Sequence, residues 1–243
     1  IGPVMEIVAD MERICPRALL INYTNPMGRI CDAVARYSSI QVVGLCHQIG
    51  AGYAMVGRVL AEELGIDVPA AFTTTHSTPS ANAARAQVAR AAEERVWITA
   101  AGTNHFTWML ELQDKATGDD LYPRFRERWA EHDPDFEPLT RRVFDAFGLF
   151  PIPGDEHLCE YLPWVSDPVT KPWEKYEISL YEWDLRAQMR TDGHAEIARM
   201  AQGAAALEPL LEVQTEGAAE VIESLTGGAA RKWPAVNLPN CGY

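Results

Sequence analysis

Residues 19–26 read Leu-Leu-Ile-Asn-Tyr-Thr-Asn-Pro, and residues 42–48 read Val-Val-Gly-Leu-Cys-His-Gln. Each stretch is a short apolar run that ends in polar side chains, as a buried strand does where it gives way to a loop. Between them, residues 27–37 carry apolar side chains at helical spacing, and Pro26 suits the start of that helix. A strand, a helix and a second strand in this order favour parallel pairing. The sequence therefore predicts an α/β fold with a parallel sheet.

A third stretch of the same kind follows later in the chain. Residues 96–101 and 106–113 are typical of two strands, and they flank Gly-Thr-Asn-His at residues 102–105. Ligands and catalytic groups gather at strand ends in open α/β sheets. The three strand ends suggest a single cleft that holds a metal and a polyhydroxylated ligand, with these candidate side chains: Asn25, Cys46, His47, Asn104 and His105.

Cys46 and His105 are the candidate metal ligands. A thiolate and an imidazole are one soft and one borderline donor. Two protein ligands leave coordination positions for substrate oxygens, which suits a catalytic metal better than a structural one. Each residue also has a plainer interpretation, since free cysteines are often buried in cores and a histidine can be a hydrogen-bonded core residue. We expect the Cys46 Sγ and a His105 ring nitrogen to lie within roughly 4 Å of one another if they share an ion.

Asn25 and Asn104 lie beside those positions. An amide offers both a donor and an acceptor, as recognition of a sugar hydroxyl requires. Asn25 has a structural alternative, because it could also cap the helix that Pro26 begins.

The second half of the chain has a different character. It is richer in helical patterns, which favours a boundary near residue 100 between a sheet-based domain, residues 1–100, and a helix-rich domain, residues 101–243. Other expected helices are residues 5–14, the segment that runs to Leu64, 83–94, 121–132, 139–147, 173–200 and 204–225, with loops at 67–82 and 151–172.

The segment from Pro153 to Trp164 concentrates titratable and aromatic side chains in one of those expected loops. Loops carry a disproportionate share of functional residues, which makes Asp155, His157 and Tyr161 candidate site residues. A solvated surface turn is the competing interpretation.

Composition excludes some classes of function. The 243 residues carry 34 acidic and 21 basic side chains, a net charge of −13 without a basic cluster, so binding to nucleic acid is disfavoured. No apolar run reaches the roughly 18 residues that a membrane span needs. The five cysteines are scattered and form no CxxC pair, which fits a reducing cytoplasm rather than a disulfide framework.

Both ends of the sequence look incomplete. The chain opens at Ile1 without an initiator methionine, and it stops at Tyr243 in sequence typical of the approach to another strand. We therefore expect further segments at both ends.

The motifs together resemble one known family. Asn-Pro after a strand, Gly-Leu-Cys-His, Gly-x-Asn-His-Phe, Asp-x-His-x-x-Glu-Tyr and the terminal Asn-x-Pro-Asn-x-Gly-Tyr are similar to the family 4 glycoside hydrolases, from about residue 19 to residue 243. The resemblance implies part of a Rossmann-like dinucleotide-binding domain, followed by a helix-rich α+β domain of the lactate/malate dehydrogenase C-terminal type. It also implies NAD, a divalent metal, usually manganese, and a homodimer or homotetramer.

The resemblance assigns roles to individual residues. Cys46 and His105 match the metal ligands, and the family's glycine-rich nucleotide loop would lie upstream of Ile1. His47 stands where members acting on phosphorylated sugars commonly have Asp or Asn, which favours unphosphorylated α-glucosides, α-galactosides or uronides. The remaining matches are Asn25, Asn104 and His157 for contacts to substrate or cofactor, and Asp155 or, as second choice, Tyr161 as the catalytic base, with His47 as a further catalytic candidate.

The reaction that the resemblance implies is hydrolysis of a small-molecule glycoside by oxidation at C3, removal of the C2 proton, loss of the C1 substituent, addition of water and re-reduction. No carboxylate pair that flanks the scissile bond is needed. A metal that stabilises the enolate typically contributes several kcal/mol. Softness alone would favour zinc over manganese at a thiolate and an imidazole, whereas the resemblance implies manganese.

Two other functions stay open on the sequence. A dehydrogenase of the lactate or malate type shares the fold and also places Asn-Pro after a strand, but it needs no metal, so Cys46 with His105 argues against it. A non-catalytic relative is the third possibility.

Overall fold

The computed structural model describes residues 1–74, 78–178, 183–208, 217–228, 230, 233 and 235–239. Its first elements in chain order are α1 (Gly2–Ile14), β1 (Leu19–Asn22), α2 (Met27–Tyr37) and β2 (Gln41–Gly44). β1 and β2 pair in parallel, from Leu19 opposite Gln41 to Asn22 opposite Gly44. This confirms the predicted strand–helix–strand unit and its parallel sheet.

Helices cover both faces of this two-stranded sheet. On one face, α1 and α2 pack against Leu20 and Val42. On the other face, α11 (Ala218–Leu225) packs through Val221 against Val43. The alternation follows because successive side chains of a strand point to opposite faces of the sheet.

α2 begins where the sequence predicts. The Asn25–Pro26 peptide bond is cis, and the Asn25 Oδ1 accepts a hydrogen bond from the Met27 N–H at 3.2 Å. Asn25 thus bonds the first N–H of α2 from the position before the N-cap residue, Pro26. One side of the helix is buried through apolar residues at helical spacing: Met27, Ile30, Cys31 and Val34.

Two further helices form the next layer. α3 (Ile49–Val59), which runs on into α4 (Ala61–Leu64), packs against α5 (Pro79–Arg95). The two helices approach closely at Gly57, where a Cβ would lie only 2.7 Å from the Val88 Cγ1. α5 begins at Thr78, whose Oγ1 accepts the Ala81 N–H at 3.2 Å.

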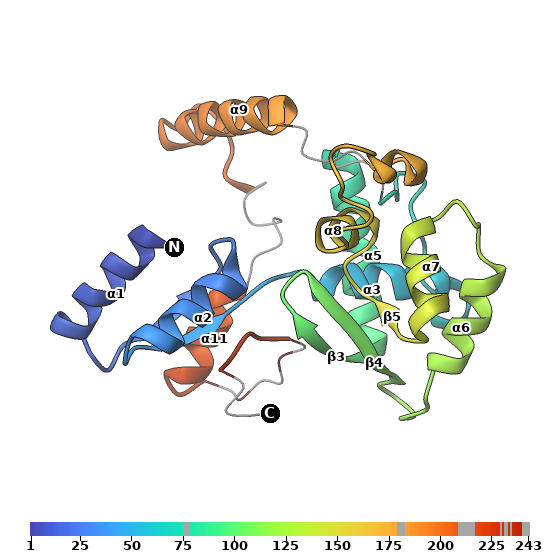
Figure 1. Cartoon of the computed structure of the whole chain (residues 1–243), viewed down its shortest axis with the longest axis horizontal. Coiled ribbons are helices and arrows are strands. Elements are labelled where there is room, and N and C mark those ends of the chain that lie inside the picture. The colour runs from blue at the N-terminus through green and yellow to red at the C-terminus, as the bar shows by residue number, and fades with distance from the viewer. Residues whose placement is uncertain are drawn as a thin grey trace.

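A second, antiparallel sheet lies beside α3 and α5 (Figure 1). β3 (Val96–Thr103) and β4 (Phe106–Asp114) form a hairpin, and the short β5 (Phe150–Pro151) pairs with β4. The two strands expected around residues 102–105 are confirmed. The Tyr122 hydroxyl joins β4 to β5, since it donates to the Met109 carbonyl at 3.0 Å and accepts from the Phe150 N–H at 2.8 Å.

α6 (Tyr122–Glu131) and α7 (Pro138–Phe147) confirm two of the expected helices. Their aromatic side chains pack edge to face around Phe150, with the Trp129 ring centroid 4.8 Å and the Phe125 centroid 4.9 Å from that of Phe150. The same core continues through Ile98 and Met109 to α3 and α5. This core joins residues on both sides of position 100.

The expected loop at residues 151–172 is partly wrong. It contains a short helix, α8 (Asp155–Tyr161). Gly154 has a φ of +78°, which lets the chain turn into the helix, and the acidic side chains of Asp155 and Glu156 occupy its first turn, where they interact favourably with the helix dipole. The short length and the surrounding prolines conceal this helix in the sequence.

The last part of the chain is less regular than the sequence suggests. In place of one helix over 173–200, the structure has the 3₁₀ turn η1 (Pro172–Tyr176) and then α9 (Trp183–Ala201). The helix expected over 204–225 is partly wrong, because residues 204–207 are not helical. Its end is present as α11, and residues 209–216 lie outside the described residues. The terminal motif, residues 237–243, is described only as far as Pro239. Within the described part of the chain, no helix is long and apolar enough to cross a membrane.

Candidate active site

The loop after β2 and the β3–β4 hairpin turn bring the predicted metal ligands together. The Sγ of Cys46 lies 3.4 Å from the Nε2 of His105, and both side chains are partly buried. This meets the expected separation of less than about 4 Å. Because one side chain follows the parallel sheet and the other lies in the hairpin, the pair joins the two sheets of the molecule.

The backbone at His105 is held in an unusual conformation. Its φ is +63°, in the left-handed region that few residues other than glycine adopt, although histidine does so more often than most. Gln48 stabilises this turn, since its Oε1 accepts the His105 N–H and the Thr107 hydroxyl, each at 3.1 Å. Such strain is commonly found at functional sites. Gln48 is a site residue that the sequence interpretation missed, although it follows directly after His47.

Gly102 makes the hairpin possible. Its φ is +142°, and a Cβ at this position would lie 2.4 Å from the Phe106 carbonyl oxygen. Only glycine fits here, so the Gly-x-Asn-His-Phe motif has a steric reason for its first residue.

α8 presents His157 to the pair. The His157 and His105 rings are stacked, with centroids 4.4 Å apart and an interplanar angle of 21°. The Nδ1 of His157 lies 3.2 Å from the Oε2 of Glu160, one helical turn further along. Glu160 was not among the predicted site residues, because its spacing from His157 has meaning only on a helix.

Tyr161 lies at the same hairpin turn. Its hydroxyl donates a hydrogen bond to the Asn104 carbonyl oxygen at 2.9 Å, and its ring stacks on that of Phe106 with centroids 5.5 Å apart. Tyr161 is 44% exposed, so it remains accessible to a ligand.

A small cavity adjoins the Cys46 side chain. Its volume is about 30 Å³, the size of an ion or a water rather than of a sugar. Asn237 reaches it from the C-terminal segment, whose backbone pairs with the end of β2 through hydrogen bonds between Asn237 and Gly44 of 2.8 and 2.9 Å. The lining residues are Cys46, Gln48, Ile49, Asn104, Thr107, Ala235 and Asn237.

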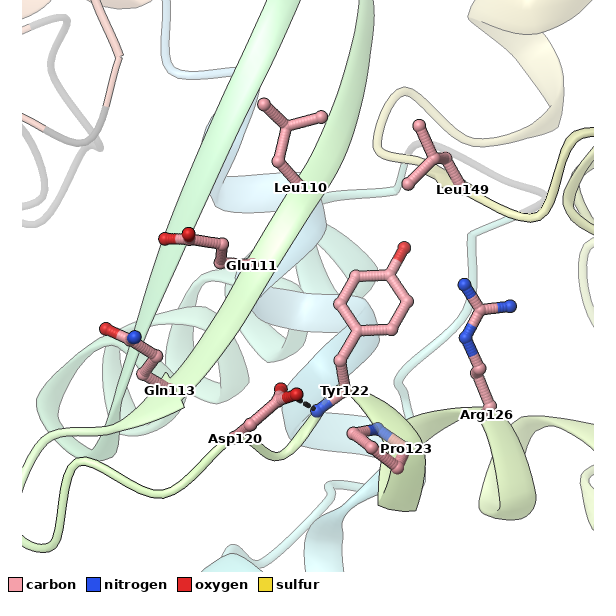
Figure 2. Close-up of a pocket in the computed structure, with 8 residues that line it drawn as sticks. All are labelled: Leu110, Glu111, Gln113, Asp120, Tyr122, Pro123, Arg126 and Leu149. Atoms are coloured by element: carbon pink, nitrogen blue, oxygen red, sulfur yellow. Dashed lines mark hydrogen bonds between the residues drawn. The ribbon is translucent and has the colours of Figure 1, made fainter.

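A larger cavity of about 440 Å³ lies at the outer side of β4 and the start of α6. Figure 2 shows Tyr122 and Arg126 from α6 beside the residues that β4 contributes. None of its lining residues is a predicted site residue: Leu110, Glu111, Gln113, Asp120, Tyr122, Pro123, Arg126 and Leu149.

Asp155 faces α7. Its two carboxylate oxygens accept the backbone N–H groups of Leu139 at 2.9 Å and Thr140 at 2.6 Å, so it caps the start of that helix. Its own N–H donates to the Oε2 of Glu137 at 2.6 Å. Burial and the neighbouring charge of Asp155 raise the pKa of Glu137 to about 8. These contacts give Asp155 a structural role that the sequence did not suggest.

Asn25 and His47 lie at the ends of the two parallel strands, and both are exposed. The amide of Asn25 is engaged at the start of α2, as described above. The His47 carbonyl accepts the Gly50 N–H at 2.8 Å and so helps to turn the chain into α3.

Comparison with known proteins gives a consistent result along the chain. The model of the family 4 glycosyl hydrolases matches residues 1–62, and that of the family 4 glycosyl hydrolase C-terminal domain matches residues 100–243. An alpha-galacturonidase of Bacillus subtilis is 28% identical over 263 aligned residues that cover 98% of this chain and 50% of that protein. An alpha-glucosidase of Erwinia rhapontici is 24% identical, with coverage of 100% and 52%.

A third relative is more similar over a shorter region. An alpha-galactosidase of Bacillus subtilis is 32% identical over 161 residues, which cover 65% of this chain and 30% of that protein. The chain thus spans about half the length of the two curated relatives that align along all or nearly all of it.

Solved structures share the fold. The crystal structure of lplD from Bacillus subtilis has a TM-score of 0.67 at 24% identity, covering 93% of this chain and 49% of that chain. A 6-phospho-beta glucosidase from Thermotoga maritima, solved with manganese, NAD+ and glucose-6-phosphate, has a TM-score of 0.55 at 22% identity, covering 92% and 45%.

Proposed function

The chain belongs to the family 4 glycosyl hydrolases, and from this premise we propose that it supplies the metal- and substrate-binding residues of a hydrolase that cleaves α-glycosidic bonds. The observation that carries the proposal is the 3.4 Å separation between the Cys46 Sγ and the His105 Nε2. A cysteine that only fills space in a core needs no such partner. Two metal-capable atoms at this distance, beside an ion-sized cavity, support a shared metal.

The donor set fits a catalytic divalent metal. We propose that Cys46 and His105 hold it, and that Asn104, which lines the same small cavity as Cys46, contacts the hydroxyls of the sugar. When bound, such a metal supplies Lewis acidity towards oxygens of the substrate. The residues of this chain would hold the sugar next to the proposed metal position between Cys46 and His105. Gln48 contributes by keeping the His105 backbone in place.

The proposed dependence on NAD rests on family membership, and not on a phosphate-binding loop among the described residues. Gly50 and Gly52 are the Gly-x-Gly pair that follows β2, but both lie within α3. A Cβ at Gly52 would lie 3.1 Å from Ile152, so this glycine serves helix packing and not a phosphate loop. We therefore assign none of the described residues to the phosphates of the dinucleotide.

Of the two candidate bases, the geometry favours Tyr161. Both oxygens of Asp155 are already bonded to backbone N–H groups of α7. Tyr161 reaches the hairpin turn that carries His105, and its hydroxyl is held by the Asn104 carbonyl. We propose that Tyr161 accepts the C2 proton as a phenolate, after its hydroxyl has released its own proton to solvent, and that Asp155 is structural. His47, on the loop beside Cys46, and His157, stacked on His105, complete the proposed set.

For the substrate we propose an unphosphorylated α-galactoside, α-glucoside or galacturonide. By its resemblance to the family, His47 stands where members that act on phosphorylated sugars commonly have Asp or Asn. Relatives include an alpha-galactosidase, an alpha-galacturonidase and an alpha-glucosidase. A cytoplasmic location and assembly into a homodimer or homotetramer belong to the same proposal, and light scattering of the purified protein measures the latter.

The test is an assay of the full-length protein on p-nitrophenyl α-galactoside, α-glucoside and α-galacturonide, each with and without manganese, NAD and a chelator. We expect release of nitrophenol from at least one glycoside only when both NAD and the metal are present. Chelator-insensitive oxidation of a 2-hydroxy acid, with no glycoside cleaved, would replace the hydrolase by a dehydrogenase.

A further inference from the structure

We propose that Glu137 is a positioning residue of the site, which holds α8, and with it Tyr161, through a proton that it shares with Asp155. The inference rests on the function proposed above for Tyr161, but the coupling between Glu137 and α8 can be measured without any turnover. The shared proton makes the position of α8 depend on pH, and so adds regulation to the proposed site.

Glu137 and Asp155 cap each other's helices. The Glu137 Oε2 accepts the N–H of Asp155, the first residue of α8, at 2.6 Å. The Asp155 carboxylate in turn accepts the Leu139 and Thr140 N–H groups in the first turn of α7, at 2.9 and 2.6 Å. Because Glu137 is itself the N-cap residue of α7, the starts of the two helices are joined through two carboxyl groups, the Glu137–Asp155 pair.

The chain is tightly packed around the Glu137–Asp155 pair. Glu137 has a φ of +52°, in the left-handed region that a glutamate rarely adopts, and such strain persists only where the surroundings fix it. A Cβ at Gly154, the residue before α8, would lie only 3.2 Å from the Glu137 Oε2. Both carboxyl groups are buried, with Glu137 6% and Asp155 8% exposed. The Glu137 carboxyl group therefore has little freedom to move away from α8.

Two adjacent buried carboxyl groups favour one shared proton. Like charges repel strongly where water is excluded, so ionisation of both groups is costly. Burial and the charge of Asp155 raise the pKa of Glu137 to about 8. At neutral pH the proton therefore stays on Glu137, which can donate it in a hydrogen bond to the Asp155 carboxylate. Above about pH 8 this hydrogen bond is replaced by the repulsion of two charges.

The neighbouring groups do not replace the shared proton. Among the described residues, the other titratable groups that face the pair are Arg85 of α5 and, on α8 itself, Glu156 and Cys159. Arg85 interacts with both Glu137 and Glu156, so its single charge is divided between two carboxyl groups. Burial raises the pKa of the Cys159 thiol to about 11, so this group stays neutral where Glu137 titrates. The proton on Glu137 is therefore the main control of the charge at the start of α8.

α8 is short enough for its first turn to determine where its last residue lies. Its seven residues, Asp155–Tyr161, span only about 10 Å, and the helix packs against both α7 and β4. At the far end, the Tyr161 hydroxyl donates to the Asn104 carbonyl oxygen at 2.9 Å. Loss of the shared proton weakens the cap of α8 and so releases Tyr161 from the hairpin turn. The alternative is that the pair is a static cap whose ionisation leaves α8 in place.

Hydrogen exchange of the full-length protein, read by mass spectrometry at pH 7 and pH 9, separates the two possibilities. A group with a pKa of about 8 loses its proton over this range, so the protection of the α8 amides should fall about tenfold after correction for the intrinsic effect of pH. Glu137→Gln cannot titrate but keeps an oxygen for the Asp155 N–H, so its α8 protection should stay constant. Glu156→Gln is the matched control, because it removes a neighbouring charge of α8 outside the pair, and it should keep the wild-type fall.

Glycoside cleavage then links the pair to Tyr161. The ratio of kcat in Glu137→Gln to kcat in the wild type cancels the ionisation of Tyr161 itself, and it should rise by up to about tenfold from pH 7 to pH 9, with little change in KM. Should Glu137→Gln not fold, as judged by circular dichroism, the wild-type exchange series and the Glu156→Gln control carry the test.

Constant α8 protection in the wild type between pH 7 and pH 9 would overturn the shared proton. A fall in protection with a constant kcat ratio would overturn the positioning of Tyr161. The exchange experiment needs no substrate, so it still decides whether the proton controls α8 if the full-length protein cleaves no glycoside. Failure of the proposed function and failure of this inference are therefore distinguishable.

Discussion

The Sγ of Cys46 and the Nε2 of His105, 59 residues apart in the sequence, lie 3.4 Å from one another. Cys46 follows a strand of the parallel sheet, and His105 lies in the turn of an antiparallel hairpin. Their proximity therefore depends on how the two sheets are packed, and a metal bound between them would stabilise that packing by mass action.

Cys46→Ser should abolish metal-dependent activity while the fold stays intact. A hydroxyl is a much poorer ligand than a thiolate for a transition metal. Cys46 is only partly buried, and serine is nearly isosteric with it, so the melting temperature of the metal-free protein should change little. Metal analysis after dialysis and a thermal melt measure the two effects. A variant with unchanged metal content and full activity would remove Cys46 from the site.

Gln48→Leu should damage the site through the His105 backbone. The substitution removes the Gln48 Oε1, which accepts two hydrogen bonds, and so takes this acceptor away from the His105 N–H. Loss of a buried partner costs about 1–3 kcal/mol, which urea unfolding detects. Metal affinity should fall as well. Thr107→Val is the control, because it removes one of the two hydrogen bonds but leaves His105 held; an equal loss of affinity in both variants would contradict the positioning role of Gln48.

Gly102→Ala should disrupt the hairpin. The new Cβ would meet the Phe106 carbonyl oxygen at 2.4 Å, on a backbone with φ of +142°. We expect a loss of more than about 3 kcal/mol in the free energy of unfolding. Gly118→Ala is the comparison, since its φ of +80° is also strained but nothing lies within 4 Å of the new Cβ. That variant should lose only about 1–2 kcal/mol. Similar losses at both positions would show that the clash at Gly102 is relieved.

Stability should depend on pH through Glu137. Burial and the charge of Asp155 raise its pKa from 4.5 to about 8. Between those values the folded state holds a proton that the unfolded state has released. The contribution to stability is therefore full below about pH 4.5, falls as the pH rises towards 8 and is lost above it.

Glu137→Gln should flatten this dependence, because a neutral amide imitates the protonated carboxyl group and its oxygen can still accept the Asp155 N–H. Urea unfolding at pH 5, 6.5 and 8 measures the slope for both proteins. The same slope in the wild type and in the variant would assign the dependence to another group.

The sequence predicts best those helices and strands that are determined by the local pattern of apolar residues. Residues 27–37 are helical from end to end because their apolar side chains recur at helical spacing after Pro26. The strands around residues 102–105 follow from their apolar runs and the intervening glycine. The sequence interpretation expected Cys46 and His105 to be close, but for a reason that does not hold, because His105 lies in the turn of a separate antiparallel hairpin and not at an end of the parallel sheet.

The rest depends on tertiary contacts that have no local pattern. α8 has only seven residues and is flanked by prolines, so its helical spacing is too short to recognise. Glu160 becomes a partner of His157 only once that helix exists. In the sequence, Asp155 resembles a free carboxylate. The fold places it against the N–H groups at the start of α7, and no local sequence pattern around Asp155 predicts this contact.

Hydrolysis in deuterated water tests the proposed reaction most directly. The full-length protein is supplied with NAD, manganese and an α-glycoside that it cleaves, and the sugar product is read by NMR. Because the proposed base removes the C2 proton before water adds, we predict deuterium at C2 of the product, and loss of that exchange in Tyr161→Phe but not in Asp155→Asn. A product without deuterium at C2, formed equally well without NAD, would contradict the elimination and the role of this site in it.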